Sequence, residues 1–343
     1  MQILQEVDMT ADMNDLARYC GVSITTVSRA LRNKGEISKE TREKVLAAAK
    51  ELNYMPNLPA RILAGGHSNT VGLIVADNSN PYYAELIHGA EDCAKDYGYG
   101  VILYNTNEDD QLELKGHQML LENRVGGLLI TSITSGKQPL IELNKRKIPF
   151  VLLNRFLEDY PTDWVRSNNE LGAYQIIQHL CSKGYKRILH ITGSETISSV
   201  RERQTGYINA LKENGCDVDP NLIYRCDLNL ESGYKSTLKA FRELDPAPTA
   251  IFAYSDLLAI GVLKALHELG KKVPADVALA GYDNIEYSPF IEPPLTTVDQ
   301  FAYEIGSEGM KILIEKINLP EDEEWQPKQI ILDPELCVRE SSG

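Results

Sequence analysis

The sequence lacks the features that would place a protein in a membrane or outside the cell. No apolar run approaches the length of a membrane span. The N-terminal residues carry acid where a signal peptide needs basic residues. The six cysteines are scattered without a Cys-x-x-Cys pair, which is typical of reduced thiols rather than of a disulfide or zinc framework. We therefore expect a cytoplasmic protein without a metal site.

Signatures of catalysis are also missing. No Gly-x-Gly-x-x-Gly motif follows an expected strand, and there is no phosphate-binding Gly-x-x-x-x-Gly-Lys-Ser/Thr motif. His267 and Glu268 are not followed by the second histidine of a zinc helix, and no histidine forms a recognisable triad. We predict that the protein is not an enzyme and uses no cofactor.

Charge is distributed unevenly along the 343 residues. The net charge is −14, but residues 11–66 hold nine Lys/Arg and six Asp/Glu, a net charge of +3. The acidic excess is therefore confined to the rest of the chain, and the N-terminal part can still meet phosphates. The length suggests two or three domains.

Residues 13–32 have the pattern of a DNA-reading helix-turn-helix. Ala17 allows two short helices to approach, and Gly21 supplies the left-handed residue of the turn. Ser23 is the expected N-cap of the second helix. Positions at helical spacing face inward, namely Leu16, Cys20, Val22, Val27 and Ala30. Any small helical hairpin is the competing interpretation.

A third helix completes the headpiece, which we place at residues 11–56. It begins at the N-cap Ser38 and packs an apolar stripe against the hairpin. The expected stripe consists of Val45, Leu46, Ala49 and Leu52.

The outward positions of the second helix are the expected DNA contacts, because a recognition helix presents its first residues to a groove. Arg29 suits guanine, and Ile24 and Thr25 suit a thymine methyl group. We expect the polar residues Thr26, Ser28, Asn33 and Lys34 to contact phosphates. Ser23, the N-cap of this helix, is also a predicted DNA contact.

From residue 70 onward, short apolar runs alternate with amphipathic helices, which predicts doubly wound parallel sheets. The expected strands are 71–77, 101–104, 127–130 and 150–153, followed by 188–191, 222–224, 250–253 and 277–280. Two similar α/β lobes in tandem predict a cleft between them.

Ligands of parallel sheets bind beyond the carboxyl ends of the strands. Aromatic, amide and charged side chains gather at these ends, and this mixture suits a sugar. Asn and Asp at such positions also commonly do no more than cap the next helix.

Residues 22–31, 38–52 and 54–63 closely resemble the headpiece and hinge of the lactose-repressor family of bacterial regulators. The resemblance continues through 80–86, 201–207, 255–261, 273–283, 293–298 and 338–341. It implies a two-lobed body like the type I periplasmic sugar-binding proteins, with crossings between the lobes near 168, 298 and 328. The N-lobe would then hold about 70–168 and 298–327, and the C-lobe about 169–297 and 328–343.

The resemblance also implies the functional residues. Six residues match effector-contacting positions of the family, namely Tyr82, Tyr83, Asn154, Arg203, Ser255 and Asp283. Residues 57–69 match the hinge helix and linker, where Leu63 corresponds to a minor-groove wedge and Arg61 lies close to it. At two positions of the expected effector site the sequence departs from the family pattern. Leu228 stands where many sugar-responsive members carry a stacking aromatic residue, and Ser255 stands in place of the more usual Asn. Trp164 is a candidate to compensate.

Together these features predict a homodimeric repressor of sugar-utilisation genes that binds near-palindromic operator DNA. We expect dimerisation through the faces of helices 83–97 and 256–269, and no C-terminal heptad helix that would build a tetramer. A regulator that responds to a purine or a phosphoprotein is the alternative. A sugar-binding protein without DNA function is a further one, and the headpiece argues against it.

Overall fold

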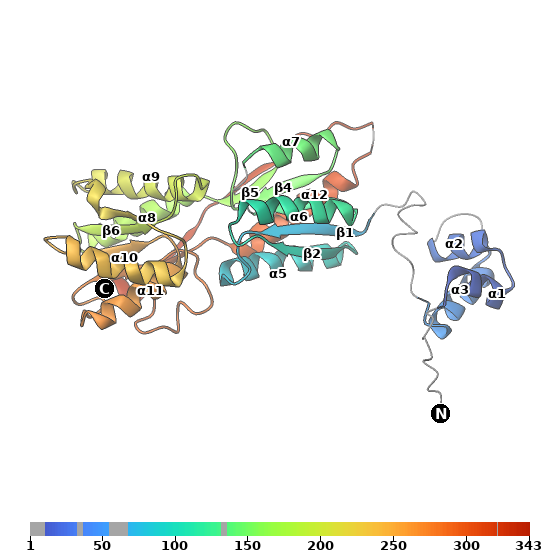
Figure 1. The fold of residues 1–343 in the computed structure, drawn as a ribbon, viewed down its shortest axis with the longest axis horizontal. Coiled ribbons are helices and arrows are strands. Elements are labelled where there is room, and N and C mark those ends of the chain that lie inside the picture. Colours follow the sequence, from blue (N-terminus) through green and yellow to red (C-terminus); the bar gives the residue numbers. More distant parts are fainter. Residues whose placement is uncertain (1–10, 33–36, 55–67, 132–135, 321) are drawn as a thin grey trace, which may run out of the picture. The chain divides into compact units, whose positions relative to one another are not determined.

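The computed structural model describes residues 11–32, 37–54, 68–131, 136–320 and 322–343. It divides the chain into two units, Met1–Ser68 and Asn69–Gly343 (Figure 1). The first unit contains α1 (Met13–Cys20), α2 (Ile24–Arg32) and α3 (Lys39–Glu51). None of the helices in the described ranges combines the length and the apolarity needed to cross a bilayer.

The headpiece forms as its local signals predict, with one correction. Gly21 has φ 65° and ψ 32°, and the Ser23 hydroxyl accepts a hydrogen bond from the Thr26 amide at 3.1 Å. Leu46, which we expected in the core, is instead 46% exposed, and Ala48 is buried. Ala48 follows Val45 by three residues, so it shares the inward face, whereas Leu46 is turned about 100° away.

The N-lobe of the second unit is a six-stranded parallel sheet in the order β11-β5-β4-β3-β1-β2. Alternate strand residues bury on opposite faces. Leu73 and Leu129 pack with α5 and α12, and Ile74 and Leu128 pack with α6 and α7. The elements are β1 (Thr70–Val75), α5 (Pro81–Asp96), β2 (Gly100–Asn105), α6 (Asp110–Glu122), β3 (Leu128–Ile130), α7 (Gln138–Lys145), β4 (Phe150–Leu153), β5 (Trp164–Ser167), α12 (Ala302–Ile317) and β11 (Gln329–Leu332).

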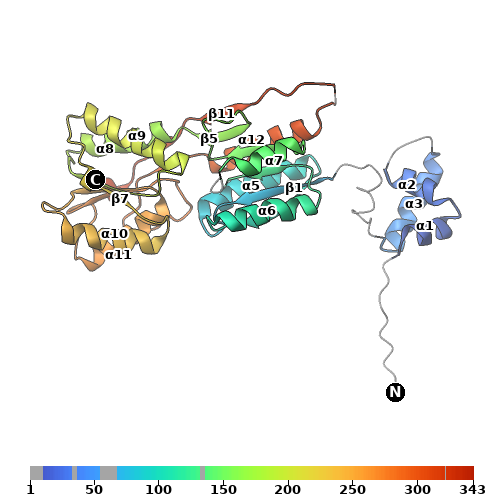
Figure 2. The ribbon, with the colours of Figure 1, turned by 45° about the horizontal axis from the view of Figure 1, so that its top comes forward.

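The C-lobe has a four-stranded parallel sheet in the order β7-β6-β8-β9. Helices α8 and α9 cover one face, and α10 and α11 cover the other (Figure 2). The elements are α8 (Asn169–Ser182), β6 (Ile188–Thr192), α9 (Ser198–Glu213), β7 (Ile223–Arg225), α10 (Leu230–Glu243), β8 (Ala250–Ala253), α11 (Asp256–Glu268) and β9 (Ala278–Ala280). A two-stranded antiparallel ribbon, β10 (Thr297–Asp299) with β12 (Glu335–Cys337), completes this lobe.

The third crossing between the lobes differs from the expected position near 328. Strand β11 pairs in parallel with β5, from Gln329 opposite Trp164 to Leu332 opposite Ser167, so residues 329–332 belong to the N-lobe. The chain returns to the C-lobe only between β11 and β12. Strand β10 likewise stays with the C-lobe as far as Asp299, where Asp283 and Asp299 form a bridge. Unpaired backbone groups at the edge of β5 account for the later crossing, because β11 satisfies them.

Candidate functional site

Helix α2 presents an outward surface in the headpiece. Ile24, Thr25 and Arg29 are exposed, whereas Val27 and Ala30 are buried. This is the arrangement in which a helix can enter a major groove with its own core-facing side protected.

The remaining predicted DNA contacts differ in their surroundings. Ser28 is half-buried, and Ser23 and Thr26 share a hydrogen bond of 2.8 Å between their hydroxyls at the start of the helix. Four predicted contacts lie outside the described residues, namely Asn33, Lys34, Arg61 and Leu63, as does most of the hinge.

A cleft of about 960 Å³ lies between the two lobes. Loops at the carboxyl ends of β1, β4 and β8 and the N-terminal part of α9 contribute to its wall. All six residues predicted to bind an effector line it, namely Tyr82, Tyr83, Asn154, Arg203, Ser255 and Asp283.

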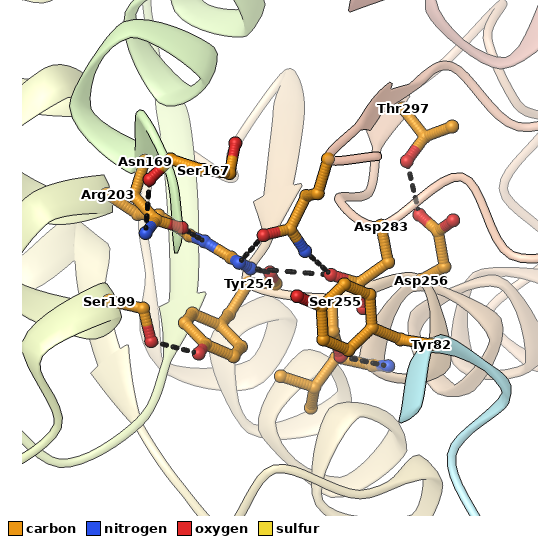
Figure 3. Close-up of polar contacts among 12 residues, drawn as sticks. Tyr82, Ser167, Asn169, Ser199, Arg203, Tyr254, Ser255, Asp256, Asp283 and Thr297 are labelled. Atoms are coloured by element: carbon orange, nitrogen blue, oxygen red, sulfur yellow. Dashed lines mark hydrogen bonds and ion pairs between the residues drawn. The ribbon is translucent and has the colours of Figure 1, made fainter. Parts of the chain in front are cut away.

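Arg203 of α9 is the central charged group of the cleft wall, and it is 1% exposed. Figure 3 shows its guanidinium group extending from Asn169 towards Asp283. Its Nε donates to Asn169 Oδ1 at 2.9 Å, and its Nη1 donates to the Tyr254 carbonyl oxygen at 2.6 Å. The group also lies 3.6 Å from the ring centroid of Tyr282. These contacts fix the guanidinium orientation before any ligand arrives.

Asp283 supplies the matching negative charge. Its Oδ1 lies 3.7 Å from Arg203 Nη1 and accepts a hydrogen bond of 2.5 Å from Gln300 Nε2. Burial raises the pKa of Asp283, and the Arg203 charge acts in the opposite direction. The residue has φ 123°, a conformation that L-residues rarely adopt. Such strain is common where a side chain must face a ligand.

Three buried polar atoms of residues that line the cleft make no hydrogen bond within the described ranges. They are the Tyr82 hydroxyl, Asn154 Oδ1 and Arg155 Nε, and all three side chains are at least nine-tenths buried. Asn154 is held by its backbone, with φ 64° and an amide that donates to the Val165 carbonyl oxygen at 2.9 Å. Because burying an unsatisfied polar group costs about 1–3 kcal/mol, these atoms point to a hydrogen-bonding ligand.

The prediction did not include the pair formed by Arg155 and Glu108. Arg155 is 3% exposed, and its Nη1 donates to Glu108 Oε2 at 2.8 Å. Glu108 and the preceding Asn107 both have positive φ values, 59° and 50°, which bring the carboxylate back over the cleft. Consecutive left-handed residues leave no clear mark in the sequence.

The residues that depart from the family pattern have distinct positions. Ser255 lines the cleft, and its hydroxyl caps α11 by accepting from the Leu258 amide at 3.3 Å. Leu228 also lines the cleft. Trp164 does not compensate for the missing aromatic, because it packs against Phe156, with 5.7 Å between ring centroids, and is not part of the described cleft wall.

Metal-ligating side chains do not cluster anywhere in the described parts of the chain, where no group of three or more His, Cys, Asp or Glu could hold an ion. The lining of the cleft offers hydrogen bonding by fixed charges and amides together with contacts to aromatic rings.

Known protein families match both units. Residues 12–57 match the model described as bacterial regulatory proteins of the lacI family. Residues 68–335 match the model described as periplasmic binding proteins and the sugar-binding domain of the LacI family.

Individual relatives match over nearly their full length. The ribose operon repressor of Halalkalibacterium halodurans is 36% identical over 331 residues, 96% of each chain. The transcriptional repressor PurR of Photobacterium profundum is 34% identical over 333 residues, 96% of this chain and 98% of its own. The crystal structure of the Lac repressor dimer bound to operator and the anti-inducer ONPF has a TM-score of 0.84 at 27% identity, covering 97% of this chain and 99% of its own. These relatives are transcriptional repressors rather than enzymes.

Proposed function

Because this chain belongs to the LacI family of bacterial regulatory proteins, we propose that it is a homodimeric repressor whose effector is an uncharged sugar or similar polyol. The protein is a DNA-binding transcription regulator of this family. What we add is the chemical class of the effector, the dimeric state, the repression of sugar-utilisation genes and an action in the cytoplasm.

The main support for an uncharged polyol is the state of the polar groups in the cleft. A hydroxyl group both donates and accepts, so it can pair with Asn154 Oδ1 and with the Tyr82 hydroxyl, which have no other partner among the described residues. Aromatic side chains of the wall offer faces to the C–H groups of a sugar ring.

The arginines of the cleft argue against a phosphorylated effector. Each of the three in the described wall has a carboxylate partner. Arg155 pairs with Glu108, Arg201 with Glu158 at 3.2 Å, and Arg203 with Asp283. No unpaired guanidinium in this part of the wall is therefore available to neutralise a phosphate.

A thermal-shift screen tests this assignment. The panel contains D-ribose and other neutral sugars, their phosphates, and the purines adenine and hypoxanthine. We expect a neutral sugar to raise the unfolding temperature and to change operator affinity, and its phosphate ester to do neither, because bound ligand stabilises the native state. If purines alone stabilise the protein, the sugar assignment is wrong. If no compound does, control by a small molecule is wrong, and a phosphoprotein partner becomes the alternative to examine.

DNA recognition by α2 is tested with Arg29→Ala. We expect discrimination between a selected palindromic site and random DNA to fall by about 1–3 kcal/mol, the value of a bidentate contact to guanine. Fluorescence anisotropy on both DNAs measures the two affinities. Lys39→Ala, which changes a basic residue of α3, is the matched control. An equal loss on both DNAs would show that Arg29 contacts phosphate instead of a base.

A further inference from the structure

Two thiols of the C-lobe face each other outside the cleft. The Sγ atoms of Cys181 and Cys216 are 3.9 Å apart, and no bond joins them. Cys181 lies in the last turn of α8, and Cys216 follows Gly215 in the segment after α9. Both side chains are half-buried, so a small solute can reach them.

The packing of α8 against α9 keeps the two thiols adjacent. Gly206 of α9 lies so close to α8 that a Cβ atom there would stand 2.2 Å from the carbonyl oxygen of Glu170. Near the thiols, Asn214 Nδ2 donates to Gln178 Oε1 at 2.5 Å. Contacts at both ends of the helix pair therefore fix its register, and the sulfur atoms need to move only slightly to reach bonding distance.

The other four cysteines have no such neighbour, and all six lie within the described ranges. Cys20 is buried in the headpiece core, and Cys93, Cys226 and Cys337 are half-buried with no second sulfur as a contact in the described residues. Proximity thus singles out one pair.

We propose that Cys181 and Cys216 form a redox-active dithiol, which a hydroperoxide converts into an intramolecular disulfide and a thiol reductant restores. In the first step a Cys216 thiolate attacks one peroxide oxygen, the O–O bond breaks, and a sulfenic acid and hydroxide form. In the second step the Cys181 sulfur attacks the sulfenic sulfur, the S–S bond forms, and hydroxide leaves. The thiol protons neutralise both hydroxides, so two thiols and one hydrogen peroxide give one disulfide and two waters.

The order of the two steps follows from the surroundings of the thiols. Burial and the adjacent Cys216 sulfur raise the pKa of Cys181, which disfavours its thiolate and makes it the poorer first nucleophile. It acts second, against a sulfenic acid that is already held beside it.

Oxidation forms a covalent bond between the last turn of α8 and the segment after α9. The same two helices carry Asn169, at the start of α8, and Arg203, in α9. The disulfide closes a loop between residues 181 and 216 and removes conformations from the unfolded chain. We therefore expect a raised unfolding temperature for the oxidised protein.

The test uses the full chain, treated with hydrogen peroxide and then analysed under non-reducing conditions. We expect a loss of two of the six thiols, a tryptic peptide pair joined through Cys181 and Cys216, and no covalent dimer. The unfolding temperature should rise by roughly 5 °C and return after dithiothreitol. Cys216→Ser should abolish the disulfide, whereas the matched control Cys226→Ser, a half-buried cysteine of the same lobe, should retain it.

Retention of all six free thiols at peroxide levels that oxidise free cysteine would overturn the proposal, as would a disulfide that joins other residues or other chains. None of these readouts uses an effector or operator DNA, so their failure is distinct from a failure of the proposed function.

Discussion

Replacing Arg203 with methionine is expected to weaken effector binding by about 10–100-fold, because the one N–H of the guanidinium that has no partner in the wall can give a charge-assisted hydrogen bond of about 1.5–3 kcal/mol to the ligand. The guanidinium group is held by Asn169, the Tyr254 carbonyl oxygen and Gln300, so it meets a ligand already oriented. Isothermal titration with the sugar that stabilises the wild-type protein measures the loss.

The same substitution also affects stability, and this effect must be separated from recognition. Without Arg203, the Asp283 side chain, 5% exposed, remains in the wall without its cation. Removing one partner of a buried pair costs about 3–5 kcal/mol. The double variant Arg203→Met with Asp283→Asn removes both charges, so we expect it to regain much of this stability but none of the effector affinity.

Operator binding serves as the second readout for these variants. The headpiece is a separate unit, so the double variant should still bind operator and should no longer respond to the sugar. Lys212→Met changes an exposed basic residue of the same helix that does not line the cleft, and is the matched control. Full effector affinity in the double variant would refute the role assigned to Arg203.

Replacing Phe290 with aspartate is expected to break the proposed dimer. Phe290 is 86% exposed and Tyr287 is 50% exposed, and the Phe290 amide donates to the Tyr287 carbonyl oxygen at 2.9 Å, so both rings belong to one turn. Large exposed aromatic groups on a soluble protein favour an interface with another chain. Truncation of an interface anchor commonly costs about 2–4 kcal/mol, so the dimer should dissociate at concentrations roughly 100-fold higher.

Loss of the dimer should reduce operator affinity more than any single change in α2. Two linked headpieces raise the effective concentration of the second, an advantage of about 10²–10⁴-fold that monomers lose. Sedimentation velocity gives the mass, and a gel shift with full and half operators gives the affinity. Leu230→Asp is the control, since Leu230 is a 46%-exposed apolar residue of the same lobe. A Phe290→Asp protein that sediments as an unchanged dimer would place the interface elsewhere, with the faces of α5 and α11 as the next candidates.

Sequence reasoning succeeded where a signal is local. The turn at Gly21 and the cap at Ser23 depend on one or two residues, and both form as predicted. Strand ends of a parallel sheet meet at one edge, so polar residues there were candidates, but the six effector residues were singled out by the resemblance to the lactose-repressor family. All six line the cleft. Their contact with an effector remains a prediction.

Long-range pairing explains what the sequence could not reveal. Strand β5 contains Arg166, and an arginine is unusual in a buried strand. Glu202 of the other lobe compensates its charge, because Glu202 Oε1 accepts a hydrogen bond of 2.5 Å from Arg166 Nη1. Arg155 and Glu108 are likewise 47 positions apart. When the partner of a charged residue is this far away in the sequence, the sequence alone does not distinguish a buried, paired residue from a surface residue.

The late position of β11 bears on how this protein is made. Residues 329–332 complete the N-lobe sheet, and residues 335–337 complete the ribbon of the C-lobe. A ribosome therefore synthesises the strands that complete both lobes only after all their other strands. Until then each lobe of the nascent chain exposes an unpaired sheet edge, a surface that chaperones and neighbouring nascent chains can bind.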